Sequence, residues 1–257
     1  MLPRDRIRAA LARDVKAGAK PSLVAFITAG YPEPRDFLKT LRAVAGAADA
    51  VEVGVPFSDP MADGVTIQRS SQLAIEKGVS LSWILDELAR RDFELPAPVL
   101  LMSYLNPLLV FGFAALAERA AEVGVSGFIV PDLPYEEGAP FAAASNPHGL
   151  ALVQMVTPGT PAQRLQRVCG ASQGFVYAVT RAGVTGRESA LPPETAQYLA
   201  AVKAASALPV CAGFGVRRAE QVREIGRHAD GAVVGAALVE VLERGEDPAA
   251  FLATLRA

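Results

Sequence analysis

The sequence predicts an α/β fold, a (β/α)8 TIM barrel with an extra N-terminal helix. Eight short apolar runs recur along the chain, and each is followed by a turn and an amphipathic stretch, the pattern of a parallel sheet. The runs are nearly continuous in apolar residues, as expected for strands covered on both faces. The length of 257 residues and 51% hydrophobic content suit one such barrel of about 250 residues. We therefore expect residues 1–257 to form a single domain.

The expected elements follow this pattern in chain order. The strands are Ser22–Ile27, Ala50–Val53, Pro98–Met102, Gly127–Val130, Ala151–Met155, Gly174–Val179, Pro209–Ala212 and Gly231–Val234. The helices between them include Arg35–Ala45, Leu81–Arg91, Phe113–Val123, Ala162–Val168, Glu194–Ala205 and Ala219–Arg227. An additional amphipathic segment, Arg4–Ala17, precedes the first strand and has no strand of its own to cover. We expect it to plug the bottom of the barrel.

An open doubly wound sheet is the alternative arrangement of eight strands and their helices. That fold usually carries a G-x-G-x-x-G loop after its first strand, where a dinucleotide binds. Here the first expected strand runs into Thr28-Ala29-Gly30-Tyr31-Pro32, which does not match. The barrel is therefore preferred.

Composition limits the classes of partner. The net charge of -2, from 25 Lys and Arg against 27 Asp and Glu, provides no overall field to attract nucleic acid or an anionic membrane. The segment Met1–Ala19 lacks the apolar core of a signal peptide. The charge-free run Leu95–Ala117 is long enough for a membrane span, but Pro98, Pro107 and Gly112 interrupt it. We expect a cytoplasmic protein that binds neither nucleic acid nor membrane.

Glu52 is the first candidate for chemistry. In Ala50-Val51-Glu52-Val53-Gly54, Val51 and Val53 face one way and Glu52 the other, because successive side chains on a strand alternate. Burying an unpaired carboxylate costs several kcal/mol or raises its pKa until it is neutral. Such a group is typical of acid–base chemistry, although a solvated or ion-paired glutamate at a strand end would also fit.

The loop after this strand contains two more carboxylates, Asp59 and Asp63. It belongs to the C-terminal rim of the barrel, where active sites of this fold are built. Two carboxylates in different surroundings can divide acid and base roles, or they can hold a divalent metal. The histidines, His148 and His228, stand in polar contexts, and no further carboxylate cluster lies at an expected strand end. We therefore expect no metal, and we expect Cys169 and Cys211, each within an apolar stretch, to be inert core thiols.

Glycines mark a second part of the rim. Gly213-Phe214-Gly215 follows the seventh strand, and Gly235-Ala236 follows the eighth. These two loops and the helix start beside them are a recurrent phosphate site in barrels, since backbone N–H groups and the helix dipole meet the anion there. After the sixth strand, the polar segment Thr180–Pro192 is unusually long for a compact domain and is interpreted as a lid.

Together these segments resemble the tryptophan synthase alpha chain family. The resemblance runs from about Ile7 to Leu255 and is most specific in Val51–Gln68. Supporting segments are Phe26–Pro32, Pro131-Asp132-Leu133-Pro134, Arg181–Gly186 and Gly213–Gly215. The resemblance implies retro-aldol cleavage of indole-3-glycerol phosphate to indole and glyceraldehyde 3-phosphate.

The resemblance also assigns roles. Glu52 would be the general acid–base group, and Asp63 would hold the indole N–H as positive charge develops. The remaining implied residues bind substrate: Phe26, Leu101, Ile129 and Tyr177 at the indole, Thr185 in the lid, and Gly186, Gly215, Gly235 and Ala236 at the phosphate. From the sequence alone, plain core packing fits the apolar members of this set equally well. No cofactor is expected in this chain.

A beta chain is the partner that the resemblance implies, in an alpha2-beta2 tetramer with pyridoxal phosphate in the beta chain. The docking surface would include 56–60, 106–112 and 131–134, and would expose Leu108, Leu109 and Phe111. Those residues would equally suit the start of a buried helix. One departure is Ala236, where the family often has Ser, so that a hydroxyl hydrogen bond of order 1 kcal/mol is lost.

Two other functions stay open. One is another phosphate-binding TIM-barrel lyase or isomerase, which would share the glycine rim but leaves the segment Pro56–Gln68 unexplained. The other is a catalytically silent activator of a beta chain, against which the presence of Glu52 and Asp63 argues.

Overall fold

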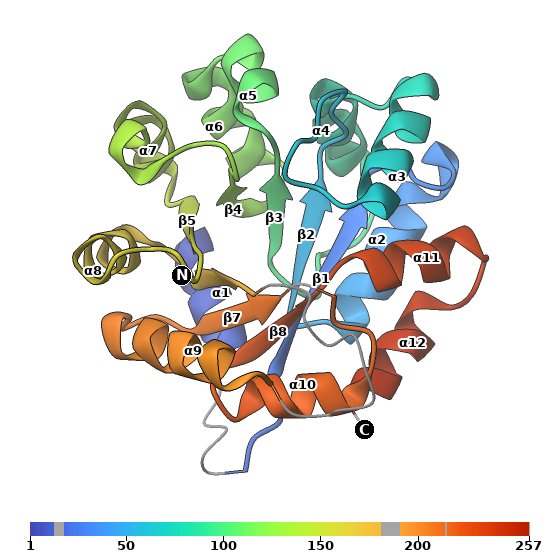
Figure 1. The fold of residues 1–257 in the computed structure, drawn as a ribbon. Helices are drawn as coiled ribbons and strands as arrows, with labels where there is room; N and C mark the ends of the chain where they lie inside the picture. The colour runs from blue at the N-terminus through green and yellow to red at the C-terminus, as the bar shows by residue number, and fades with distance from the viewer. Residues whose placement is uncertain (13–17, 181–190, 214, 257) are drawn as a thin grey trace.

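The computed structural model describes residues 1–12, 18–180, 191–213 and 215–256, which form a closed barrel of eight strands in sequence order. Every pair of neighbouring strands is parallel, and helices surround the barrel (Figure 1). The strands are β1 Ser22–Thr28, β2 Ala50–Gly54, β3 Val99–Met102, β4 Val125–Ile129, β5 Ala151–Val156, β6 Val176–Val179, β7 Val210–Gly213 and β8 Gly231–Val234. The predicted fold class is confirmed, and each strand lies within two residues of its expected bounds.

The helices complete the βα units. They are α1 Pro3–Leu11, α2 Phe37–Ala47, α3 Val65–Glu76, α4 Leu81–Arg90, α5 Leu105–Phe111, α6 Phe113–Glu122, α7 Ala139–Ser145, α8 Ala162–Ala171, α9 Pro193–Ala205, α10 Ala219–Gly226, α11 Ala236–Glu243 and α12 Pro248–Leu255. Short 3-10 turns lie at Pro34–Asp36 (η2), Tyr135–Glu137 (η3) and Asn146–His148 (η4). Ranges were not predicted for α3, α5, α7, α11 and α12, most of which span only seven or eight residues, too few for a helical period to stand out.

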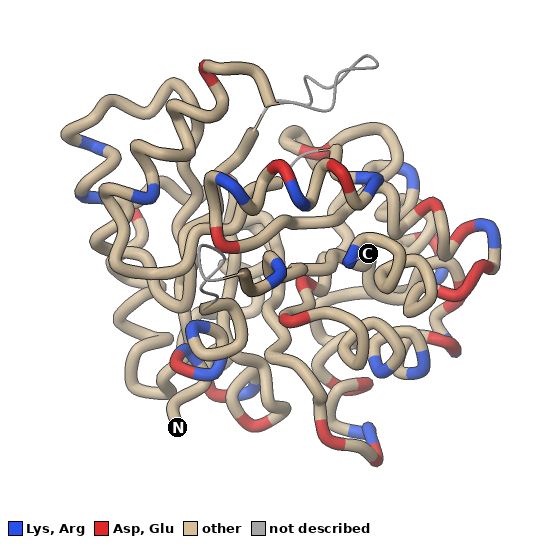
Figure 2. Tube along the Cα trace, turned by 90° about the horizontal axis from the view of Figure 1, so that it is seen from below, with Lys and Arg blue, Asp and Glu red and all other residues tan. Residues whose placement is uncertain are grey.

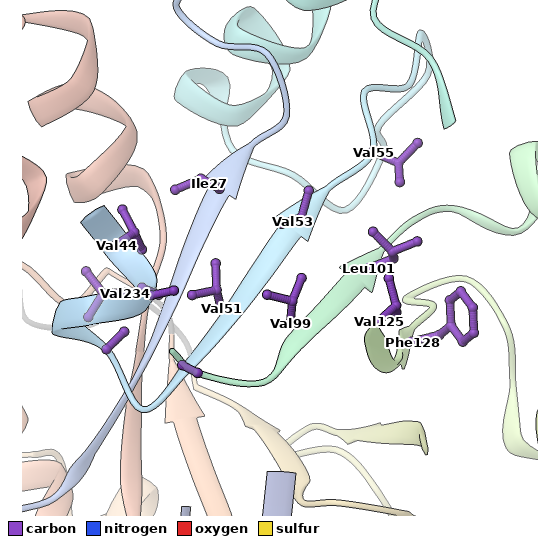
Figure 3. Packing of buried hydrophobic residues seen from close by; sticks show 14 of the residues in the cluster. Ile27, Val44, Val51, Val53, Val55, Val99, Leu101, Val125, Phe128 and Val234 are labelled. Atoms are coloured by element: carbon purple, nitrogen blue, oxygen red, sulfur yellow. The ribbon is translucent and has the colours of Figure 1, made fainter. Parts of the chain in front are cut away.

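Strand alternation divides the core into two layers. The outer layer lies between the barrel and its helices and contains Val51, Val53, Val99 and Leu101, which Figure 3 shows on neighbouring strands β2 and β3. The inner layer fills the barrel with residues such as Leu100. Both layers are built from buried apolar residues, so most strand residues are apolar on both faces. The near-continuous hydrophobic runs in the sequence have this cause.

Helix α1 closes the bottom of the barrel. Its Ile7 and Leu11 are fully buried and belong to the inner layer. The Ser22 hydroxyl at the start of β1 donates a hydrogen bond to the Leu11 carbonyl over 3.0 Å. The predicted plug is confirmed, although the helix ends at Leu11 and residues 13–17 of the expected segment lie outside the described residues.

Charged residues are distributed over the helices without separation of sign, as Figure 2 shows in a view turned by 90° from that of Figure 1. The charge-free run 95–117 resolves into β3, α5 and the first half of α6. Within the described ranges, no helix has the length and apolar content to cross a membrane.

Both cysteines are buried, and burial raises the pKa of Cys169 and of Cys211.

Candidate active site

Glu52 lies on the inner face of the barrel. It pairs in register with Phe26 of β1 and Leu100 of β3, while its neighbours Val51 and Val53 face the outer layer. Its side chain is 1% exposed, and neither carboxyl oxygen has a hydrogen-bond partner among the described residues. Burial raises the pKa of Glu52 from its ordinary value of 4.5 to about 8. A solvated or ion-paired glutamate, the alternative left open by the sequence, is therefore excluded within the described structure.

The Glu52 carboxyl borders a cavity of about 660 Å³ at the C-terminal end of the barrel. The same cavity is bordered by Asp63 from the loop after β2, by Tyr177 of β6, and by Gly215 and Gly235 from the loops after β7 and β8. Residues more than 180 positions apart thus meet at one site. Parallel strands bring their carboxyl ends to one rim, which is why barrel sites form there.

Asp63 is held by Tyr104, which follows β3. The Tyr104 hydroxyl donates to Asp63 Oδ2 over 3.0 Å and accepts from the Ala62 N–H over 2.9 Å. The Phe57 ring stacks on Tyr104 with centroids 5.1 Å apart. Burial raises the pKa of Asp63, and the Tyr104 hydrogen bond opposes that shift by stabilising the anion. Tyr104 was not predicted, since no local pattern reveals a contact across 41 residues.

The two loop carboxylates do not form a pair. Asp59 is exposed, accepts a hydrogen bond from its neighbour Ser58 over 2.5 Å, and does not border the cavity. The two carboxylates that border the cavity are therefore Glu52 and Asp63. In the described part of the chain, no group of three or more His, Cys, Asp or Glu side chains is placed to hold a metal ion.

The apolar wall differs from the expected set at β3. Phe26 and Tyr177 border the cavity as predicted, and Ile129 lies in the inner layer without bordering it. Leu101 packs in the outer layer, so its expected contact with indole is wrong. It pairs in register with Val53, and Met102, one residue later, borders the cavity instead. A shift of one residue moves a strand side chain to the opposite face.

Gly54 makes room for the aromatic wall. A Cβ at this position would collide with the Phe26 ring, so glycine allows that ring to lie against β2. Gly54 stands two residues after Glu52, on the same face of the strand. The ring therefore packs beside the buried carboxyl.

Tyr177, on the same cavity, is also perturbed by its surroundings. Burial, followed by the charge of Glu52, raises the pKa of Tyr177, which keeps its hydroxyl protonated.

The structure describes three of the four residues expected at the phosphate, Gly215, Gly235 and Ala236. Gly215 has a φ of +80°, a conformation that favours glycine. Gly235 directly precedes α11, and Ala236 is its first residue. All three residues border the cavity. The N–H groups of a first helical turn have no acceptor within the helix. Thr185, Gly186 and most of the expected lid Thr180–Pro192 lie outside the described residues.

The expected docking surface is only partly exposed. Leu108 is fully buried in the outer layer, so its predicted exposure is wrong, and Phe111 is partly buried. Leu109 is 54% exposed and Val110 is 81% exposed. Helix α5 therefore turns Leu108 inward and presents Leu109 and Val110, a contrast that its short sequence does not reveal.

Comparison with known proteins identifies the family. A sequence profile of the tryptophan synthase alpha chain matches residues 12–256. The chain belongs to this family. The tryptophan synthase alpha chain of Nitratidesulfovibrio vulgaris (strain DP4) is 41% identical over 241 residues, covering 93% of this chain and 94% of that protein. That of Laribacter hongkongensis is 43% identical over 231 residues, covering 89% and 88%.

Solved tryptophan synthase structures share the fold. Tryptophan synthase subunit alpha from Legionella pneumophila superposes with a TM-score of 0.86 at 34% identity, covering 98% of this chain and 97% of that one. A chain of tryptophan synthase from M. tuberculosis, in an open form with BRD0059 bound, gives 0.84 at 32% identity, covering 99% and 96%. Tryptophan synthase alpha chains are lyases of tryptophan biosynthesis that cleave indole-3-glycerol phosphate by a retro-aldol reaction. Membership favours this reaction over another phosphate-binding lyase or isomerase.

Proposed function

We propose that Glu52 carries the proton for the alpha reaction, the cleavage of indole-3-glycerol phosphate to indole and glyceraldehyde 3-phosphate. The supporting observation is a buried carboxyl without a hydrogen-bond partner among the described residues that opens into the same cavity as Asp63 and the glycine rim. With a pKa raised to about 8, Glu52 is mainly protonated at neutral pH. A general acid is most effective when its pKa lies near the working pH.

One proton on Glu52 suffices for the whole reaction. Protonated Glu52 donates to C3 of the indole, which leaves a carboxylate and a positive charge on the ring. The carboxylate then takes the proton of the side-chain hydroxyl as the carbon–carbon bond breaks. The electron pair of that bond returns to the ring, indole leaves, and the hydroxyl carbon becomes the aldehyde of glyceraldehyde 3-phosphate. Glu52 ends protonated, ready for another turnover.

Asp63 acts as a fixed anion rather than a proton carrier. Its hydrogen bond from Tyr104 lowers the pKa against the effect of burial and fixes the carboxylate in one orientation. An anion near the indole N–H stabilises the positive charge that develops when C3 is protonated. Because Asp63 is already held in place before the reaction, the site needs no reorganisation while the charge develops.

Substrate binding divides between the two sides of the cavity. Phe26, Met102 and Tyr177 provide apolar surface for the indole, with Ile129 packed beneath them. Gly215, Gly235 and Ala236 present backbone donors to the phosphate, together with Gly186, and Thr185 acts in the lid. Without the Ser hydroxyl, Ala236 contributes through its N–H group at the start of α11.

The chemistry of these residues needs no cofactor in this chain, because one proton carrier and one fixed anion complete the reaction. The expected partner is a tryptophan synthase beta chain, which holds pyridoxal phosphate, in an alpha2-beta2 tetramer. We place the docking surface at 56–60, 106–112 and 131–134, with Leu109 and Val110 as its exposed apolar centre. The proposed setting is the cytoplasm, with residues 1–257 acting as one domain.

The direct test is indole formation by the purified chain from indole-3-glycerol phosphate, with and without a beta chain. Indole is expected in both assays. Indole in neither assay would exclude the alpha reaction. A chain that forms no indole yet raises the turnover of the beta chain would be a silent activator, and that result would also contradict the proposal.

A further inference from the structure

A polar bridge connects two helices, α3 and α11, with the loop after β7 at the cavity rim. Glu240 of α11 accepts two hydrogen bonds from Arg217 in the loop after β7, Nη1 to Oε2 over 2.6 Å and Nη2 to Oε1 over 2.8 Å. Its Oε1 also accepts from the Thr66 hydroxyl at the start of α3 over 3.3 Å. One carboxylate on α11 therefore links the start of α3 with the loop that follows β7.

Each arm of the bridge ends close to a residue of the cavity. Arg217 stands two residues after Gly215, and Thr66 stands three residues after Asp63. Glu240 stands one helical turn after Ala236, so both residues share a face of α11. Gly215, Asp63 and Ala236 all border the cavity. The bridge is thus joined through short stretches of backbone to both the phosphate side and the Asp63 side of the cavity.

The loop after β7 is also fixed at its other end. The Gln221 side-chain carbonyl of α10 accepts from the Arg217 and Arg218 N–H groups over 2.8 and 3.1 Å. Its amide donates to the Gly215 carbonyl over 3.3 Å. Gly215 is therefore held to α10 by Gln221, and Arg217 holds the same loop to α11.

We infer that Arg217 and Glu240 are positioning residues for the phosphate end of the substrate. They set the distance between Gly215 and the first turn of α11, whose backbone N–H groups must reach the same anion. This inference rests on the proposed phosphate site and adds to it a charged pair that touches neither the phosphate nor the reacting atoms. A bidentate Arg–carboxylate pair suits this role, because its planar geometry fixes orientation as well as distance.

Stability alone gives little reason for the bridge. The Arg217 side chain is 51% exposed and that of Glu240 is 26% exposed, and ion pairs this close to solvent contribute little to folding. We therefore expect the bridge to affect ligand binding more than the unfolding midpoint. In a merely structural role, its loss would lower the midpoint or the active fraction, and hence kcat, without raising KM.

Glu240→Gln separates positioning from simple electrostatics, because the two predict opposite signs. Removing a negative charge near an anion site should tighten phosphate binding if only charge matters. If the bridge positions the rim, binding of inorganic phosphate should weaken about fivefold. KM for indole-3-glycerol phosphate should then rise by a similar factor, with kcat within about twofold.

Three further variants complete the experiment. Arg217→Lys keeps the charge but loses the bidentate geometry, and should weaken phosphate binding in the same direction. The double variant Arg217→Glu with Glu240→Arg should recover most of the affinity. Glu246→Gln is the matched control, because Glu246 accepts two hydrogen bonds from Arg244 over 2.6 and 2.9 Å just beyond the far end of the same helix. It should leave phosphate binding unchanged.

The outcomes distinguish the bridge from the phosphate site itself. Wild-type binding of inorganic phosphate, with unchanged or tighter binding in Glu240→Gln, would overturn the bridge and leave the site standing. A wild-type chain that binds no phosphate would overturn the site and the bridge together. An equal loss in Glu246→Gln would also overturn the inference, since the effect would then not be local to the rim.

Discussion

The Tyr104 hydroxyl donates a hydrogen bond to Asp63 Oδ2 over 3.0 Å and accepts one from the backbone of Ala62. This contact joins the loop after β2 to the end of β3. It fixes a partly buried carboxylate at the edge of the cavity that Glu52 also borders. The proposed fixed anion is therefore itself held by an uncharged residue.

Tyr104→Phe should lower kcat/KM about tenfold. The substitution keeps the ring that stacks on Phe57 but removes the hydroxyl that orients Asp63, and a hydrogen bond to a charged group is worth about 1.5 kcal/mol. Initial rates of indole formation measure the effect. Tyr135→Phe is the control, because Tyr135 also borders the cavity. A comparable loss in both variants would show that any hydroxyl removed from this cavity has the same effect.

The free energy of unfolding of Glu52→Gln should increase relative to that of the wild type as pH rises. The pKa of Glu52 is raised in the folded state, from 4.5 to about 8. Its favourable contribution is therefore fully present below pH 4.5 and is lost as pH rises toward 8, since the unfolded chain releases the proton first. Between pH 5 and pH 8, the free energy of unfolding of the variant should gain about 4 kcal/mol over the wild type.

Urea unfolding at these two pH values measures that difference. Glu118→Gln replaces an exposed carboxylate on α6 and should show almost no pH-dependent difference from the wild type. If Glu52→Gln behaved like Glu118→Gln, the Glu52 carboxyl would already be ionised at neutral pH in the free protein, and it would not start the reaction as an acid.

Ala236→Ser should tighten the binding of inorganic phosphate about fivefold, because it adds one hydroxyl donor, worth about 1 kcal/mol, at the first residue of α11. Binding of indole alone should not change, which provides an internal control. Isothermal titration with each ligand measures both quantities. Unchanged phosphate affinity would mean that the anion does not reach the start of α11.

Val110→Asp should weaken binding of the beta chain at least tenfold and leave the turnover of the isolated alpha chain unchanged. Val110 is 81% exposed on α5, and a charge buried without a partner in an interface is strongly unfavourable. Surface plasmon resonance with an immobilised beta chain measures the affinity. Leu2→Asp is the control, because Leu2 is 45% exposed beside α1, at the opposite end of the barrel. Equal weakening by both variants would contradict the proposed docking surface.

The barrel itself could be predicted because its signals are local. Near-continuous strands, turns and amphipathic helices each occupy a short window, and the alternation in Val51-Glu52-Val53 correctly placed Glu52 on the opposite face from the two valines. The same alternation did not help at Leu101. The β3 run is apolar on both faces, so its residue types do not show which side chain points inward. An error of one residue then reverses the assignment.

Contacts between distant loops could not be predicted in the same way. Tyr104 reaches Asp63 from another strand end, and Arg217 reaches Glu240 across a helix and a strand. Neither pair has a spacing that marks it, because their proximity follows from closure of the barrel rather than from local periodicity. The exposure of Val110 beside buried Leu108 likewise depends on how α5 packs against the outer layer.

The rate of indole formation by Glu52→Gln, measured together with the dissociation constant for indole-3-glycerol phosphate, tests the proposed proton carrier most directly. Glutamine keeps the shape of the side chain and removes the group that titrates. We predict that kcat falls on the order of a thousandfold, as expected for loss of general acid–base catalysis, while the dissociation constant changes by less than about fivefold. Turnover near that of the wild type would contradict the account.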